Sequence, residues 1–354
     1  MELAVHFFMQ SMDSRWDTRA RKPNVSVQWF AVSLAAKPLL ELARLSPLGT
    51  ATRFAATPTV KIMSVFKVGK ATVTRIEETY LPIYTPGVDL FPECTPEILK
   101  EHGHWLAPNH YDPASNKIKL SVHSWLLQID GRKILIDCCC GNHKPRPARP
   151  FWNMLNTPWL DRLAAAGARP DEIDMVMCTH LHHDHLGWNT QLRDGKWVPT
   201  FANARYVFSK VDFDYFQKMD NDPATAPAEF GTFRECVMPV VDAGRADLVT
   251  GPHHLNEFID IEPAPGHSPG HFVFKLNAGG SRAMIIGDVF HHMLQIYYPD
   301  WNFPKNSDAD QARVSRRRVF DECAASGAMV FPGHVGAPFA GYIERTASGF
   351  RPRF

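Results

Sequence analysis

Short hydrophobic runs that end in polar residues recur along the chain from about residue 65 onward. Residues 119–130 and 133–140 are rich in β-branched and aliphatic side chains, and the Asp130-Gly131 pair between them is typical of a tight β-hairpin turn. A strand is also expected to begin near Met63. Further short strands are predicted over residues 173–180, 204–210, 258–267, 271–277, 282–292 and 328–334.

Helix signals lie between these strands. One helix is predicted to begin after an N-cap at Thr157 and to stop at Gly167. An amphipathic helix is predicted over residues 308–327, with Asp308 or Ser307 as its cap. The alternation of strands and helices indicates an α/β protein.

Residues 1–62 differ from the rest of the chain. They carry eight Lys/Arg and four Asp/Glu, a net charge of +4 that leaves −3 for residues 63–354. They show no clear helical or strand period, so we expect a poorly ordered extension, with Met63 as the natural start of one domain over residues 63–354. A secretory signal with residues 25–36 as its apolar core is the alternative, but Gln28 and two serines dilute that core.

The overall composition argues against several classes of protein. With 354 residues, 45% of them hydrophobic, the chain can bury one large core. A net charge of +1 does not suggest a nucleic-acid partner. Residues 25–36 fall short of the ~20 apolar residues of a membrane span. Seven cysteines, three of them adjacent at 138–140, do not form a disulfide framework, so we expect a cytoplasmic protein.

Four predicted strands end in a side chain that can bind a metal: His180, His267, Asp288 and His334. In sheet-based α/β folds, ligand sites lie beyond the strand ends, where loops from separate strands converge. Imidazole and carboxylate are the usual ligands of zinc, and they also suit iron, manganese or cobalt. The alternative is a set of core or solvated histidines, which is unfavourable because burying unpaired imidazoles costs desolvation energy.

The run HLHHDH over residues 180–185 contributes several of these candidates. His180 and His182 are two residues apart, so on an extended strand end both side chains project to the same side. Asp184 and His185 follow where the chain turns and can face a second point close by. His183 remains between the two pairs, and we expect it to orient a neighbour or to pack beneath the loop.

The motifs THLHHDHLG, PGHSPGH, IIGDVF and FPGH, with LIDCCCG upstream, resemble those of the metallo-β-lactamase superfamily over about residues 65–338. The resemblance implies an αββα sandwich of two mixed β-sheets flanked by helices, with a dinuclear metal site along one edge. The implied ligands form two groups joined by a bridging Asp288: His180, His182 and His267 for the first ion, and Asp184, His185 and His334 for the second.

The true β-lactamases commonly have a cysteine at the position of Asp288. A carboxylate there resembles instead the lactonases, glyoxalase II-type thioesterases, tRNA-processing nucleases and methyl parathion hydrolase-like enzymes. The 82 residues from His185 to His267 favour the methyl parathion hydrolase-like branch. The resemblance implies two divalent cations, with Zn²⁺ expected and Fe, Mn or Co as alternatives. Two such ions ~3.5–4 Å apart can share a hydroxide and lower its pKa towards 7. Asp184 is expected to orient that hydroxide and to pass its proton to the leaving group.

The expected function is therefore hydrolysis of a small ester, lactone or phosphotriester by the bridging hydroxide. Aromatic residues near the motifs and the lack of a basic cluster favour an uncharged to moderately polar small molecule over a nucleic acid or a charged thioester. A glyoxalase II-like thioesterase and a mononuclear-iron persulfide dioxygenase are the alternatives on the same fold.

Other residues are expected to support the site. The resemblance implies that Asp137 lies beneath the metals and supports a ligand. Trp188, His291 and Tyr297 are predicted to lie around the ligands or in the wall of the substrate pocket. The aromatic, Pro-rich segment 79–113 is expected to cover that pocket or to form a homodimer contact.

Overall fold

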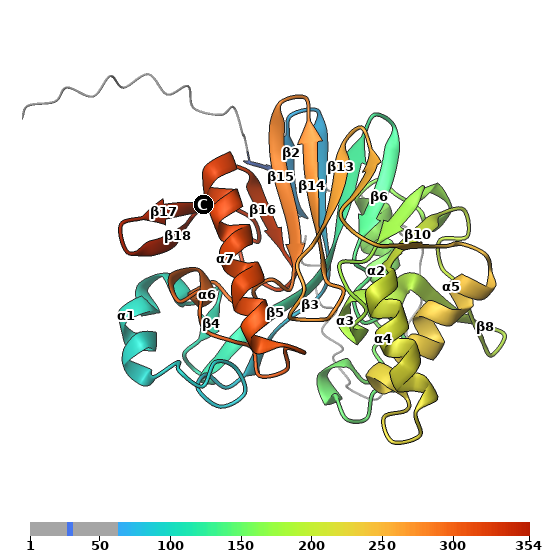
Figure 1. The fold of residues 1–354 in the computed structure, drawn as a ribbon, viewed down its shortest axis with the longest axis horizontal. Coiled ribbons are helices and arrows are strands. Elements are labelled where there is room, and N and C mark those ends of the chain that lie inside the picture. The colour runs from blue at the N-terminus through green and yellow to red at the C-terminus, as the bar shows by residue number, and fades with distance from the viewer. Residues whose placement is uncertain (1–26, 31–62) are drawn as a thin grey trace, which may run out of the picture.

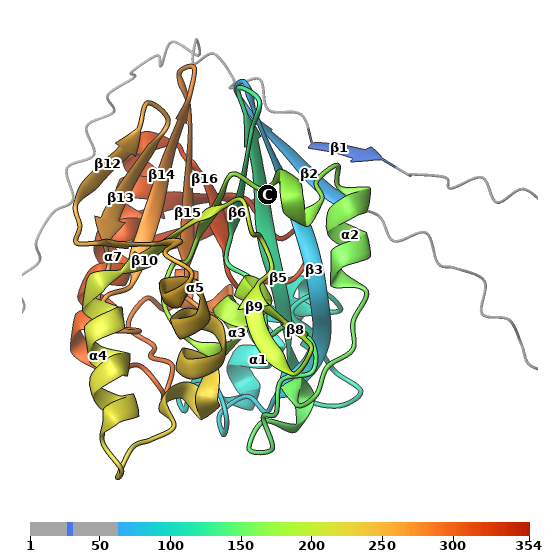
Figure 2. The same ribbon diagram turned by 90° about the vertical axis from the view of Figure 1, so that its right-hand side faces the viewer.

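Two β-sheets face each other, and helices cover their outer faces (Figures 1 and 2). The computed structural model describes residues 27–30 and 63–354. Figure 2 shows the sheets edge-on, with helix α2 (Trp159–Ala165) outside one of them and helix α7 (Ala309–Ser326) outside the other. The α/β class and the sandwich of two mixed sheets predicted from the sequence are confirmed.

The larger sheet has the strand order β1-β2-β3-β5-β6-β7-β10-β11, and β4 pairs with β5. Its strands are β1 (Val27–Phe30), β2 (Met63–Val68), β3 (Ala71–Tyr84), β4 (Tyr111–Asp112), β5 (Lys117–Ile129), β6 (Arg132–Ile136), β7 (Met175–Met177), β10 (Arg205–Ser209) and β11 (Ala246–Val249). Pairing is antiparallel from β1 to β6 and parallel from β6 to β11, so the sheet is mixed.

The smaller sheet has the order β12-β13-β14-β15-β16 and is mixed because β15 and β16 pair in parallel. Its strands are β12 (His253–Asn256), β13 (Ile259–Pro263), β14 (Phe272–Ala278), β15 (Ser281–Gly287) and β16 (Met329–Pro332). Two separate hairpins complete the strands: β8 (Thr190–Arg193) with β9 (Lys196–Pro199), and β17 (Tyr342–Thr346) with β18 (Gly349–Arg353).

The helices lie in the connections between strands. Besides α2 and α7, they are α1 (Pro96–Leu106), α3 (His183–Leu186), α4 (Lys210–Asn221), α5 (Met238–Asp242) and α6 (Leu294–Tyr297). Shorter helical turns are η1 (Pro150–Trp152), η2 (Pro170–Glu172), η3 (Gly187–Asn189), η4 (Ala228–Gly231) and the π-turn η5 (Phe233–Val237).

Alternation of side chains along the strands produces three hydrophobic layers. On β5, Leu126 belongs to the layer beneath α2 and α4, whereas Trp125 and Leu127 pack in the layer between the two sheets. Val319 and Phe320 of α7 contribute to a third layer on the outer face of the smaller sheet. The central strands are therefore buried on both faces, which explains why they read as continuous hydrophobic runs.

Local signals in the sequence are mostly confirmed, with one correction. The hairpin between β5 and β6 turns at Asp130 and Gly131, both with positive φ, and the Asp308 side chain caps α7 by accepting from the Gln311 N–H. The prediction that Thr157 caps α2 is wrong, because α2 begins at Trp159. Thr157 instead donates its backbone N–H to Asn142 Oδ1 over 2.8 Å.

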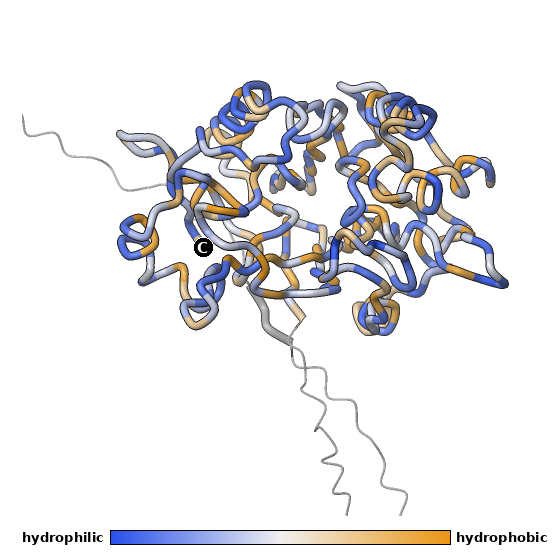
Figure 3. Tube along the Cα trace, turned by 90° about the horizontal axis from the view of Figure 1, so that it is seen from below, coloured by the Kyte–Doolittle hydropathy of each residue, from blue (hydrophilic) through white to orange (hydrophobic). Residues whose placement is uncertain are grey.

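Most of the predicted N-terminal extension lies outside the described residues. Within it, β1 pairs antiparallel with β2, whose first residue is the expected strand start, Met63. Hydrophobic and hydrophilic positions are interspersed along the outer segments (Figure 3). Across residues 63–354, the helices are all too short or too polar to cross a membrane.

Candidate metal centre and pocket

Loops at the ends of strands from both sheets bring the predicted ligands together. His180 lies three residues beyond β7, Asp288 directly follows β15, and His334 lies two residues beyond β16. His267 is in the loop between β13 and β14. The short strands stop here because the chain leaves each sheet to turn towards the neighbouring loop, and each of these four side chains is buried.

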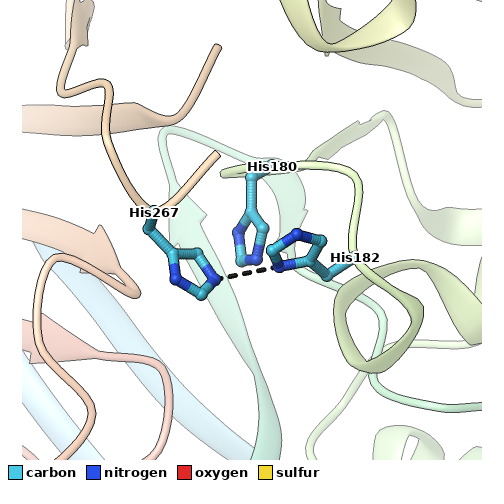
Figure 4. Close-up of side chains that lie close together, drawn as sticks. All are labelled: His180, His182 and His267. Atoms are coloured by element: carbon cyan, nitrogen blue, oxygen red, sulfur yellow. Dashed lines mark hydrogen bonds between the residues drawn. The ribbon is translucent and has the colours of Figure 1, made fainter. Parts of the chain in front are cut away.

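The first group consists of three imidazoles. The possible ligand atoms of His180, His182 and His267 all lie within 4.8 Å of one another. His182 Nδ1 and His267 Nε2 are 2.9 Å apart, as the dashed line in Figure 4 shows. His182 precedes α3 in an extended conformation, so its side chain points to the same side as that of His180, as the two-residue spacing predicts.

The second group combines two imidazoles with a carboxylate. Asp184, His185 and His334 also have ligand atoms within 4.8 Å of one another. The Nε2 atoms of His185 and His334 are 3.2 Å apart, and His334 Nε2 lies 3.5 Å from Asp184 Oδ2. Asp184 and His185 lie on the single turn of α3, and the His185 ring lies beside that of His180, with centroids 4.1 Å apart, so the two groups adjoin each other.

The Asp288 carboxylate lies between the two groups. Its Oδ2 atom is 3.3 Å from His267 Nε2 in the first group and 3.2 Å from His334 Nε2 in the second. Its Oδ1 atom is 3.4 Å from His185 Nε2. One carboxylate therefore reaches both groups, which is the position that a bridging ligand requires.

The donor set fits divalent metal ions. His180 Nε2 and Asp288 Oδ1 are buried and have no hydrogen-bond partner among the described residues. Two nitrogens bound to one tetrahedral ion at 2.0–2.1 Å are about 3.3 Å apart, close to the observed spacings of 2.9 and 3.2 Å. Burial and the neighbouring imidazoles hold the pKa of His180 well below its usual value, so this side chain is neutral, as a ligand must be.

His183 is the histidine that joins neither group. Its Nδ1 atom lies 3.1 Å from Glu229 Oε2, and its ring packs against Trp152 and Phe230. Burial alone would raise the pKa of Glu229, but His182 and His183 lower it to about 2, so Glu229 is ionised. The expectation that His183 packs beneath the loop or orients a neighbour agrees with this position.

The segment that carries these residues matches a known protein family. The sequence profile of the metallo-beta-lactamase superfamily matches residues 118–334, a segment that contains every residue of both groups and Asp288. The chain belongs to the metallo-β-lactamase superfamily. Its relatives include an N-acyl homoserine lactonase of Bacillus cereus, 20% identical over 177 residues. That match covers 49% of this chain and 60% of the relative.

Other relatives of this superfamily member are similarly distant. The N-acyl homoserine lactonase AiiB of Agrobacterium fabrum is 26% identical over 122 residues, 31% of this chain and 40% of the relative. The chain thus matches less than two thirds of the length of either lactonase.

Solved structures show the same fold. AidC, described as a dizinc quorum-quenching lactonase in complex with a product, has a TM-score of 0.63 and 21% identity over 82% of this chain and 96% of its own. The hydrolase AbOPH of the β-lactamase superfamily has a TM-score of 0.67 and 22% identity over the same shares. At these identities the likeness establishes the metallo-β-lactamase fold alone.

In this member of the superfamily, Asp137 supports both the ligand run and the second group. Asp137 Oδ2 lies 2.9 Å from His185 Nδ1, and Oδ1 accepts the backbone N–H of Thr179 over 2.8 Å. This contact fixes which nitrogen of His185 faces the other ligands. It is the position implied by the sequence resemblance; its effect on metal binding stays a prediction.

Two buried carboxylates that sequence reasoning missed hold the ligand loops. Asp212 on α4 accepts from the Leu181 N–H at 3.3 Å, the Ser268 hydroxyl at 2.7 Å and the Gly270 N–H at 2.6 Å, so it joins the loops of His180 and His267. No local motif marks it, because its three partners come from two distant segments.

Glu78 on β3 is the second of these carboxylates. It accepts from the backbone N–H groups of Cys140 and Gly141 at 2.7 and 3.0 Å, and from Trp188 Nε1 at 2.7 Å. The loop it holds packs so closely on Gly187 that a Cβ there would lie 1.8 Å from the Cys140 carbonyl carbon. Only glycine fits at position 187.

The three adjacent cysteines belong to the hydrophobic core. Cys138, Cys139 and Cys140 are buried, and burial raises the pKa of each thiol well above its usual value. Their backbone pairs with the ligand run, since the Cys138 N–H donates to the His185 carbonyl over 2.6 Å.

A pocket opens beside the two ligand groups. His291, predicted near the ligands, lies on its wall with Nε2 3.2 Å from Asp288 Oδ2. Besides the proposed ligands, His183 and His291, the wall contains three kinds of side chain: the aromatic Tyr84, Trp152, Phe230 and Phe303, the apolar Leu120, and the charged Arg149, Glu229 and Lys305. Tyr84 comes from the segment 79–113 that was expected to cover the pocket.

Two residues predicted around the ligands or in the pocket wall, Trp188 and Tyr297, do not line the pocket. Trp188 is buried and stacks on Trp159, with ring centroids 5.2 Å apart, because its indole N–H is directed to Glu78. Tyr297 is at the surface and packs against His102 and Trp105 of α1. Neither ring lines the pocket.

Proposed function

We propose that this protein is a dinuclear metal-dependent hydrolase of small esters, with lactones as the first class to test. The observation that carries the proposal is the bridging position of Asp288 between two ligand groups. The relatives that are N-acyl homoserine lactonases support the choice of lactones. Phosphotriesters are a further substrate class to test, and the reason for including them is the sequence resemblance to methyl parathion hydrolase-like enzymes.

The proposed ligands are seven residues, the six of the two groups and the bridging Asp288, and Zn²⁺ fits their imidazole and carboxylate donors. When bound, two divalent ions supply a hydroxide at neutral pH and polarise a substrate oxygen. Hydrolysis adds one water across the ester C–O bond, giving an acid and an alcohol.

Two side chains have a further role in this proposal, one of them a proposed ligand. Asp184 would hold the proton that the leaving alcohol takes up, since its Oδ2 atom lies within the second group and on the pocket wall. Burial, together with Asp184 and Asp288, raises the pKa of Tyr84, so its phenol is neutral and can donate a hydrogen bond to substrate.

We also propose a reducing, cytoplasmic location. All seven cysteines are unpaired and buried, and none forms a disulfide with another. Proteins of oxidising compartments normally pair such residues.

The test begins with metal analysis and turnover on the same preparation. We expect about two metal equivalents per chain and hydrolysis of a homoserine lactone, a p-nitrophenyl ester or methyl parathion. His182→Ala and Asp288→Ala should each lower kcat/KM by more than about 100-fold, because loss of outer contacts to ligands already costs 10–100-fold. His253→Ala, at an exposed histidine on β12, is the matched control.

Other outcomes would overturn the proposal. A single iron with oxygen uptake would favour the dioxygenase alternative. A preference for S-lactoylglutathione would favour the thioesterase. Undiminished turnover in both ligand variants would contradict the assignment of the site.

A further inference from the structure

Two cationic side chains from distant parts of the chain line the pocket beside the proposed metal centre. Arg149 precedes η1, and Lys305 lies in the segment before α7. No basic cluster could be predicted here, because the two residues are far apart along the chain. Only the fold brings them to the same pocket.

Neither cation has an ion-pair partner within residues 63–354. The Arg149 guanidinium carbon lies 4.8 Å from the Phe230 ring centroid, and its buried Nε has no hydrogen-bond partner in that part of the chain. Arg146, three residues earlier, is different: its guanidinium donates to Glu235 Oε2 over 2.6 Å and to the Phe230 carbonyl over 3.1 Å. Arg146 is thus committed to the fold, whereas Arg149 is not.

The one carboxylate on the wall outside the proposed ligand groups is already engaged. Glu229 Oε2 lies 3.1 Å from His183 Nδ1, and no ion pair joins it to Arg149 or Lys305 in the described segment. Burial and the charge of Arg149 lower the pKa of Lys305, as expected for two cations that face the same cavity. Partly buried cations that form no ion pair keep their N–H donors available to an anion.

We propose that the pocket selects esters or lactones that carry a second, anionic group, a carboxylate in the simplest case, which Arg149 and Lys305 hold away from the scissile bond. This inference rests on the proposed hydrolase function. Arginine offers paired N–H donors that match a carboxylate, and lysine adds a point charge. The Tyr84 and Phe303 rings on the same wall suit the apolar part of the substrate between its two ends.

The experiment compares two esters of similar length and leaving group on the metal-replete enzyme: p-nitrophenyl valerate and mono-p-nitrophenyl glutarate. The measured quantity is the ratio of kcat/KM for the anionic ester to that for the neutral one. Arg149→Gln and Lys305→Met should each lower this ratio by about tenfold, the effect of one charge-assisted contact. Lys67→Met, at an exposed lysine on β2 that does not line the pocket, should leave it unchanged.

A ratio that is the same in the wild type and both pocket variants would overturn the inference while leaving the hydrolase proposal intact. If neither ester nor any lactone is hydrolysed, the hydrolase proposal fails. The proposed anion selectivity is then tested by ligand binding alone. In that case calorimetry with 4-carbamoylbutanoate and its neutral counterpart glutaramide should show tighter binding of the anion, weakened in both variants. Equal affinity of the variants for the anion would mean that the carboxylate binds elsewhere, and would refute the inference.

Discussion

Substitution of Asp212 tests whether a residue outside the ligand groups sets their geometry. Its carboxylate accepts three hydrogen bonds from the two loops that carry His180 and His267. In Asp212→Ala the donors at Ser268 and Gly270 lose contacts of 2.7 and 2.6 Å, and each unsatisfied buried donor costs about 1–3 kcal/mol. The longer contact to Leu181 contributes less.

The magnitude follows from these donors and from the cost of burying the charge. Burial raises the pKa of Asp212 in spite of its hydrogen bonds, so removal of the carboxylate recovers part of the loss. We expect Asp212→Ala to lower the free energy of unfolding by about 3 kcal/mol, and Asp212→Asn, which keeps one acceptor oxygen, by about 1–2 kcal/mol. Misplaced loops should also weaken metal binding by about 10–100-fold.

Urea denaturation gives the free energy of unfolding, and competition with a chelator gives the metal affinity. Asp214→Asn is the matched control, since Asp214 lies on the same helix but is exposed and pairs only with Lys210, a contact worth about 0.3–0.5 kcal/mol. The reasoning is refuted if Asp212→Asn matches Asp214→Asn in both measurements. A loss of stability with unchanged metal affinity would show that Asp212 supports the fold and not the ligands.

Three further predictions concern neighbouring features. Gly187→Ala should cost about 3 kcal/mol or more in denaturation, because its Cβ would overlap the Cys140 carbonyl, whereas Gly103→Ala in α1 meets nothing within 4 Å and should gain about 0.5–1 kcal/mol. Asp137→Asn should weaken binding of one metal equivalent by about 10–100-fold in chelator competition; full retention of both would contradict its role. Burial and the charge of Lys119 lower the pKa of His110 to about 4, so the unfolded chain binds the proton more readily. The contribution of neutral His110 to the free energy of unfolding is therefore fully present above pH 6.5 and is lost as the pH falls towards 4. His110→Phe should flatten this part of the decline in urea midpoints measured across the range.

The parts of the site that could be predicted from the sequence depend on short-range geometry. The two-residue spacing of His180 and His182 places them on one side of an extended segment, and the turn that follows brings Asp184 and His185 to a second point close by, beside His334. Strand ends could be read from hydrophobic runs, so the convergence of His267 with the others followed from a general property of α/β sheets.

The parts that could not be predicted depend on long-range packing. Trp188 directly follows the ligand run, yet the close contact between Gly187 and Cys140 and the hydrogen bond to Glu78 direct its ring into the core. Thr157 has a side chain that is common at N-caps, but its backbone N–H is hydrogen-bonded to Asn142 from another loop, and α2 begins beyond it. No local pattern predicts that Arg149 and Lys305 line the same pocket, because only the fold brings their two segments to one cavity.

The proposed ligands come from opposite halves of the sandwich: His180 to His185 follow β7 of the larger sheet, whereas His267, Asp288 and His334 follow strands of the smaller one. Each bound ion would therefore cross-link the two halves, and its binding energy would stabilise the folded protein. A substitution that weakens the packing between the two halves should therefore lower the metal affinity before any unfolding is visible.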